Sequence, residues 1–179
     1  NIDPYKISHP VPRERIANLQ VLVEASPYAD KLEPPALQAR HDMMRAKIAV
    51  YTKGQAGASR IFRKENKSLA PQYADAQSAY LYGSPKAALA KVDALIKSQP
   101  KNAYFHELRG DILMKANRPA DAGKAYASAI ALDPAKSGIL QISYGQALLA
   151  MGTQEAAQQA ITQLRKGLDR DRENASGYR

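Results

Sequence analysis

The chain has 179 residues, 45% of them hydrophobic, which is enough to bury a core as one domain or one short repeat array. It contains two Phe, no Trp and no Cys, which excludes disulfides, cysteine nucleophiles and zinc knuckles. The formal net charge is +9, and no apolar run approaches the ~18 to 20 residues of a membrane span. Abundant alanine with few aromatic residues predicts an all-α protein of thin helices packed through small side chains.

Residues 1–33 contain the stretch ISHPVPRERI, in which His9 and two prolines precede a charged helix start. The prolines keep the loop extended, because each one moves its preceding residue away from the helical region. A helix is expected over residues 11–25, with one apolar face formed by Ile16, Leu19 and Val23. His9 is then either a polar loop residue before this helix or part of a chemical site.

The pattern of residues 34–68 predicts a shorter, degenerate helix pair. This pair would cap the repeat array that begins at residue 69. The pattern Tyr51-x-x-Gly54 returns 29 residues later as Tyr80-x-x-Gly83, which indicates a repeat of similar construction.

Basic residues dominate the end of this pair, where Glu65 is the single acidic residue between positions 43 and 68. Four of them have the spacing i, i+3, i+4, i+7 and would share one helix face, the basic stripe: Arg60, Arg63, Lys64 and Lys67. Such a face is most simply solvated, but it could dock on an acidic protein surface or on anionic lipid headgroups. Nucleic-acid binding is disfavoured because few aromatic residues are interleaved with the charges.

From residue 69 onwards one pattern recurs, in which a turn residue is followed by an alanine-rich helix. The turn residues Gly83, Asn117 and Gly152 are spaced 34 and 35 residues apart, and so are Ala88, Ala122 and Ala157. In the preceding helices, Gly110 and Gly145 fall where paired helices must approach closely. The pattern predicts six antiparallel helices over residues 69–172, with the three alanines buried where helices meet.

The period of 34 resembles that of the tetratricopeptide repeat (TPR) family. The middle repeat matches the family pattern best, at Gly110, Leu113, Ala122, Tyr126, Ala129 and Pro134. The third repeat departs from the pattern because Asp169 stands where the closing proline is expected. The resemblance implies a TPR-like α-solenoid over residues 69–179, with about three repeats, the start of a further helix and a concave peptide-binding surface.

By the register of that family, the first helix of each pair lines the concave groove. The expected groove residues are Tyr73, Gln77, Tyr80, Tyr104, Glu107, Asp111, Met114, Lys115, Ile139, Ile142, Gln146 and Leu149. A groove for a partner's terminal carboxylate would need Lys, Arg or Asn here, so we expect protein or peptide clients but no carboxylate clamp. The alternative is that several of these residues pack between helices.

No catalytic motif is recognisable in the chain. HExxH, a Ser/His/Asp arrangement and a glycine-rich phosphate loop are absent, and His9, His41 and His106 lie far apart in the sequence. We therefore expect no catalytic residue, metal ligand or cofactor within this chain.

The segment DPYKISHPVPRERIANLQ resembles the one that follows the catalytic site in zinc metallopeptidases of the CAAX prenyl protease-like gluzincin family. The matching residues are His9, Pro10, Arg15, Ile16 and Leu19. In bacterial members a TPR array often follows this segment.

That resemblance implies that the chain is a fragment of a periplasmic zinc-dependent metallopeptidase involved in envelope protein quality control. Its zinc would be held by an HExxH domain preceding Asn1, with His9 near the metal, and the repeats would contact clients and this catalytic domain. The alternative is a free-standing TPR adaptor without a peptidase parent.

Overall fold

The computed structural model describes residues 12–31, 33–63 and 68–178. These residues form helices and no strand, which confirms the all-α prediction. The chain divides into two compact units, Asn1–Gln38 and Ala39–Arg179. The first contains α1 (Pro12–Glu24), so the helix expected over residues 11–25 is confirmed.

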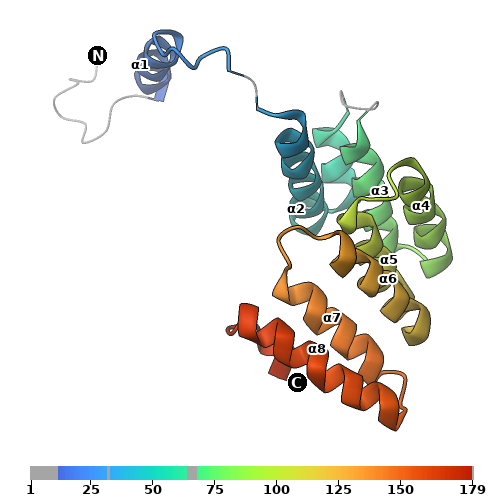
Figure 1. Ribbon diagram of the computed structural model, residues 1–179. Coiled ribbons are helices and arrows are strands. Elements are labelled where there is room, and N and C mark those ends of the chain that lie inside the picture. Colours follow the sequence, from blue (N-terminus) through green and yellow to red (C-terminus); the bar gives the residue numbers. More distant parts are fainter. Residues whose placement is uncertain (1–11, 32, 64–67, 179) are drawn as a thin grey trace. The chain divides into compact units, whose positions relative to one another are not determined.

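Helix α2 (Pro35–Ile61) is broken at Gly54, whose φ of 66° and ψ of −176° are not helical. Glycine suits this position because positive φ is costly for residues with a Cβ. The break divides α2 into a long arm that ends before Gly54 and a short arm that follows it (Figure 1). The long arm buries Met43, Ala46 and Val50.

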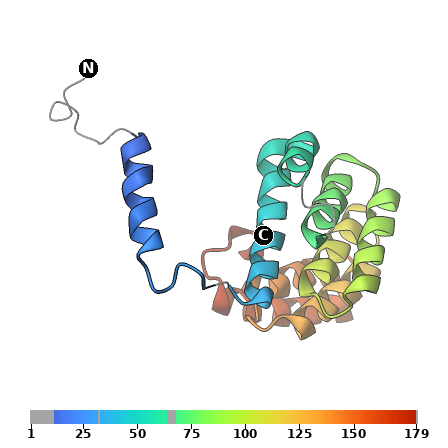
Figure 2. The ribbon, with the colours of Figure 1, turned by 90° about the horizontal axis from the view of Figure 1, so that it is seen from above.

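Six further helices follow over the range that the repeat pattern assigned to them. They are α3 (Leu69–Tyr82), α4 (Pro85–Ser98), α5 (Ala103–Lys115), α6 (Pro119–Leu132), α7 (Gly138–Leu149) and α8 (Gln154–Arg170). From α3 to α8 each helix packs on the next in chain order, and a short 3-10 turn, η2 (Ala175–Tyr178), lies against α8 (Figures 1 and 2). This sequential stacking is an α-solenoid, as expected.

Local sequence explains where the second helix of each pair begins. Ser84 and Thr153 cap α4 and α8, since their hydroxyl oxygens accept backbone N–H groups at 3.3 and 3.2 Å. Asn117 and Gly152 have φ values of 55° and 72°, the left-handed conformation that commonly ends a helix. Gly83 differs from these two, because its φ is −108°.

Paired helices touch through positions that lack a side chain. A Cβ on Gly110 would lie 2.5 Å from the Tyr126 ring, and one on Gly145 would lie 2.7 Å from Leu164 Cγ. Both distances are far below van der Waals contact, so α5 pairs with α6, and α7 with α8, only because these residues are glycine. The close approach expected at both positions is confirmed.

The alanines expected between paired helices are buried in the first two pairs but not in the third. Ala88 and Ala122 have no exposed surface, whereas Ala157 is partly exposed and Ala156 is buried in its place. The prediction for Ala157 was therefore wrong by one residue. Helix α8 starts 35 residues after α6, whereas its buried alanine, Ala156, lies 34 residues after Ala122.

We expect Ala122→Phe to destabilise the array by about 1 to 3 kcal/mol or more, because the fully buried site has no room for a ring. Ala131→Phe, at an exposed position of the same helix α6, is the matched control. Urea unfolding of both variants measures the effect. An Ala122→Phe variant as stable as the control would contradict this packing.

Candidate partner-binding surface

Three of the expected groove residues do not line a surface, which corrects the prediction for Tyr73, Gln77 and Ile142. All three are about 1% exposed. The Tyr73 ring packs on Phe105 at a centroid distance of 5.7 Å, and its hydroxyl accepts a hydrogen bond from Gln77 Nε2 at 2.9 Å. Ile142 packs against Gly167 and Gly177. These side chains stabilise contacts between helices instead of meeting a partner.

The other expected groove residues reach the surface on α3, α5 and α7. Lys115, Ile139, Gln146 and Leu149 are exposed, and Tyr80, Tyr104, Glu107, Asp111 and Met114 are partly buried. We call these nine residues, together with Lys47 and Tyr51 of α2, the first-helix surface. Gln146 is already engaged, since its Nε2 donates to the backbone oxygen of Ser176 at 2.9 Å.

An apolar row follows the repeat register along this surface. Tyr51, Tyr80, Met114 and Leu149 lie at intervals of 29, 34 and 35 residues, each towards the end of the first helix of its unit. Tyr51 is 54% and Leu149 45% exposed, and the two between them are partly buried. A repeated apolar position that stays accessible in successive units is typical of a surface that meets an extended partner.

An ion pair crosses from α2 to α5 beside this row. Lys47 Nζ lies 3.0 Å from Glu107 Oε1. Burial alone would lower the pKa of Lys47. Attraction to Glu107, the hydrogen bond to it and the charges of Asp111 and Tyr51 together outweigh burial, so the pKa is raised. Lys47 and Tyr51 were not among the expected groove residues. The echo of Tyr51-x-x-Gly54 by Tyr80-x-x-Gly83 was the signal that could have placed Tyr51 there.

Asp111 is the carboxylate at the centre of the first-helix surface. Its Oδ1 accepts a hydrogen bond from the Tyr126 hydroxyl of α6 at 2.7 Å. Burial raises the pKa of Asp111 to about 6; the bond from Tyr126 lowers it, Glu107 raises it and Lys47 lowers it. Within the described residues, no cation lies within ion-pair distance of this carboxylate.

A second lysine, Lys115 at the end of α5, contacts the end of α3 on this surface. Lys115 Nζ donates to the backbone oxygens of Tyr80 and Leu81 and lies 5.4 Å from the centroid of the Tyr80 ring. Burial, followed by repulsion from Asp111, raises the pKa of Tyr80 to about 12. Tyr80 is thus held on both its backbone and its ring, so it offers a pre-positioned aromatic contact.

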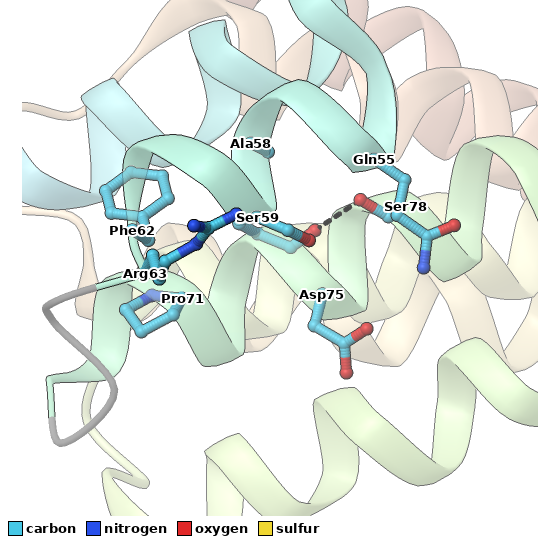
Figure 3. A pocket seen from close by; sticks show the side chains of 9 residues that line it. Gln55, Ala58, Ser59, Phe62, Arg63, Pro71, Asp75 and Ser78 are labelled. Atoms are coloured by element: carbon cyan, nitrogen blue, oxygen red, sulfur yellow. Dashed lines mark hydrogen bonds between the residues drawn. The ribbon is translucent and has the colours of Figure 1, made fainter.

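A small pocket lies between the short arm of α2 and α3. Its volume is about 200 Å³, below the ~300 to 1,000 Å³ of typical small-molecule sites. Arg63 extends past Phe62 and Pro71 towards Ser59 at its edge (Figure 3). Two of its polar groups are already engaged: Ser78 Oγ donates to the Ala74 oxygen at 2.8 Å, and Asp75 pairs with Lys91. The pocket gathers no set of groups suited to catalysis.

The basic stripe does not form the helix face that its spacing predicted. Helix α2 ends at Ile61, so Arg63 lies beyond it in a turn, and both Arg60 and Arg63 are exposed. Lys64 and Lys67 lie outside the described residues.

His9 also lies outside the described residues. Among the positions that are described, no group of three His, Cys, Asp or Glu side chains could hold a metal ion. None of the helices in the described ranges combines the length and apolar character needed to cross a membrane.

No protein-family model matches the chain, and no curated protein matches it. We therefore interpret the first-helix surface from its own geometry and from the two sequence resemblances.

The partly buried Asp111 gives a pH test of this surface. The pKa of Asp111 is raised from 3.8 to about 6 in the folded state, so folding favours the protonated carboxyl group. The contribution of this group to stability is therefore complete below pH ~4 and is lost as the pH rises through about 6. Asp111→Asn keeps an acceptor for Tyr126 without the charge. We compare the unfolding free energy of the native chain with that of Asp111→Asn. The native value minus the variant value should fall by up to about 3 kcal/mol between pH 4 and pH 7.

Denaturant unfolding at four pH values between these limits measures the difference. Asp169→Asn, at an exposed position of α8, is the control. A difference between native chain and Asp111→Asn that does not vary with pH would show that the carboxylate is solvated.

Proposed function

We propose that this chain is a protein-interaction module that binds a segment of a client protein along the first-helix surface. The observation that carries the proposal is the apolar row of Tyr51, Tyr80, Met114 and Leu149, which recurs in successive units and stays accessible. Tyrosine supplies a large contact area with little entropy to lose, and methionine adapts its shape to different partners. A linear row on a solenoid suits an extended or helical segment of a client.

The charges beside the row indicate which segments suit it. Glu107 and Asp111 stand on α5 where a carboxylate clamp would carry Lys, Arg or Asn. Lys47 pairs with Glu107, whereas within the described residues the hydrogen-bond donor to Asp111 is the neutral Tyr126 hydroxyl. The surface therefore disfavours a free C-terminal carboxylate and favours internal segments of a client.

We further propose that these repeats are of the TPR type and belong to a periplasmic zinc metallopeptidase that acts in envelope protein quality control. Support comes from the HPVPRERI stretch followed by a helical array with a 34-residue period. The parent's zinc and catalytic groups would lie in a separate domain. HExxH in the residues that precede Asn1 in the parent protein supports this proposal, and its absence favours a free-standing adaptor.

We expect Tyr80→Ala and Tyr104→Ala each to weaken client binding by about 1 kcal/mol or more, because rigid aromatic anchors carry much of the energy of such interfaces. Both rings are partly exposed, so the array should stay folded. The probe is a peptide selected for binding to the native chain from a random library. Titration calorimetry gives the affinities.

Ile161→Ala is the control for this experiment, since Ile161 is 48% exposed on α8 and lies outside the first-helix surface. Equal affinity of the native chain and the Tyr80→Ala/Tyr104→Ala double variant would show that this surface is not the binding site.

The proposal also predicts that this chain alone neither cleaves casein nor binds zinc tightly, because a catalytic zinc needs three protein ligands and the described residues offer no such group. Zinc content after dialysis and a fluorescent casein assay test this. Stoichiometric zinc together with proteolysis would overturn the assignment of catalysis to a separate domain.

A further inference from the structure

The long arm of α2 exposes a second apolar stripe, distinct from the face that packs into the array. We call it the α2 seam; it consists of the apolar Met44, Ile48 and Tyr51 with the polar His41 at its start. Met44 is 54%, Ile48 53% and Tyr51 54% exposed. The seam residues follow one another at intervals of 3, 4 and 3 residues, the spacing of the a and d positions of a heptad.

The other side of the same arm is already in use. Met43, Ala46 and Val50 are 4% exposed or less and belong to the hydrophobic core. The arm is therefore apolar on two sides, but the described part of the unit Ala39–Arg179 covers only one of them. A helix that is apolar all round is normally buried all round.

The last helix of the array provides an internal comparison. Along α8 every exposed position is polar or charged except Ile161. Repeat arrays need terminal elements with polar outer faces to remain soluble. Helix α8 has such a polar outer face, whereas the long arm of α2 has the surface of an internal helix.

Charge indicates what covers the seam. From Pro35 to Lys53 the long arm carries Arg40, Arg45, Lys47 and Lys53 against Asp42 alone, a net charge of +3. Arg40 and Lys47 flank one edge of the seam and Arg45 the other. Lys47 already pairs with Glu107, and Arg45 with Asp42, so Arg40 provides most of the charge that a partner would meet. A second copy of the chain would bring like charges together across this contact, whereas acidic flanks would complement them.

We propose that the α2 seam binds an amphipathic α-helix of a separate partner protein, one that carries Asp and Glu at the positions beside its apolar stripe. Apolar side chains of the partner helix pack between those of the seam, and its carboxylates face the basic edges. The inference goes beyond client binding, because it uses a different face of α2. The seam shares Tyr51 with the first-helix surface, and Lys47 lies at the border of both.

Three synthetic helical peptides of three heptads each test the proposal. The acidic probe has Leu at a and d and Glu at e and g, the basic probe has Lys at e and g, and the third keeps Glu but replaces Leu by Ser. Fluorescence anisotropy with the full chain measures their affinities. We expect the acidic probe to bind at least about tenfold more tightly than either of the other two.

Two variants of the chain report on the two parts of the contact. Met44→Ser/Ile48→Ser removes exposed apolar surface and should weaken the acidic probe at least about tenfold. Arg40→Glu should reduce the preference for the acidic over the basic probe, since Arg40 flanks the seam and is exposed. Ile161→Ser, at a similarly exposed apolar position on α8, is the control and should leave both affinities unchanged.

Several results would overturn the proposal. They are equal binding of acidic and basic probes, no saturable binding of the acidic probe, or seam variants that bind it like the native chain. Light scattering that shows the native chain dimerising through the seam would identify a second copy as the occupant. Tighter probe binding after Ile16→Ser/Val23→Ser would identify the chain's own helix α1 as the segment that occupies the seam. If Tyr80→Ala and Tyr104→Ala do not weaken client binding, the proposal for the first-helix surface is contradicted, but the proposal for the seam is not.

Discussion

The array depends on how closely its paired helices approach one another. Gly110, Gly145 and Gly167 each stand where a Cβ would lie 2.5 to 2.7 Å from a neighbouring side-chain carbon. A methyl group at any of them would force a pair apart or displace a large side chain, and dense packing leaves no space for that displacement. Because the helices are thin and rich in alanine, the short distance between them replaces bulky side chains as the source of contact area.

The same close approach sets the chemistry of the partner-binding surface. Tyr126 lies over Gly110, and its hydroxyl reaches the carboxylate of the next residue, Asp111. The ring fills the space that glycine leaves and holds the carboxylate where burial raises its pKa to about 6. Packing and electrostatics therefore share one pair of neighbouring residues, and a substitution at Gly110 would alter both.

The sequence predicted the helical class, the six repeat helices and the close contacts at Gly110 and Gly145, because each of these is a local pattern with a fixed period. Burial of Tyr73, Gln77 and Ile142 was not predictable in this way. Periodicity tells which face of a helix a residue occupies, but not whether a second helix or the terminal turn also covers that face. The pair of Lys47 and Glu107 joins residues 60 positions apart, and no pattern in either helix indicates the other partner.

That ion pair also has a consequence for how the array opens. In a simple repeat protein each unit interacts with its nearest neighbours, so the ends fray independently of the middle. Lys47 instead reaches past α3 and α4 to α5. Both side chains are partly exposed, so the pair contributes at most about 1 kcal/mol, which makes separate opening of α2 rarer by up to about fivefold. The N-terminal end of the array therefore shares in the cooperativity of its centre, and amide hydrogens of the long arm of α2 should exchange together with those of α5.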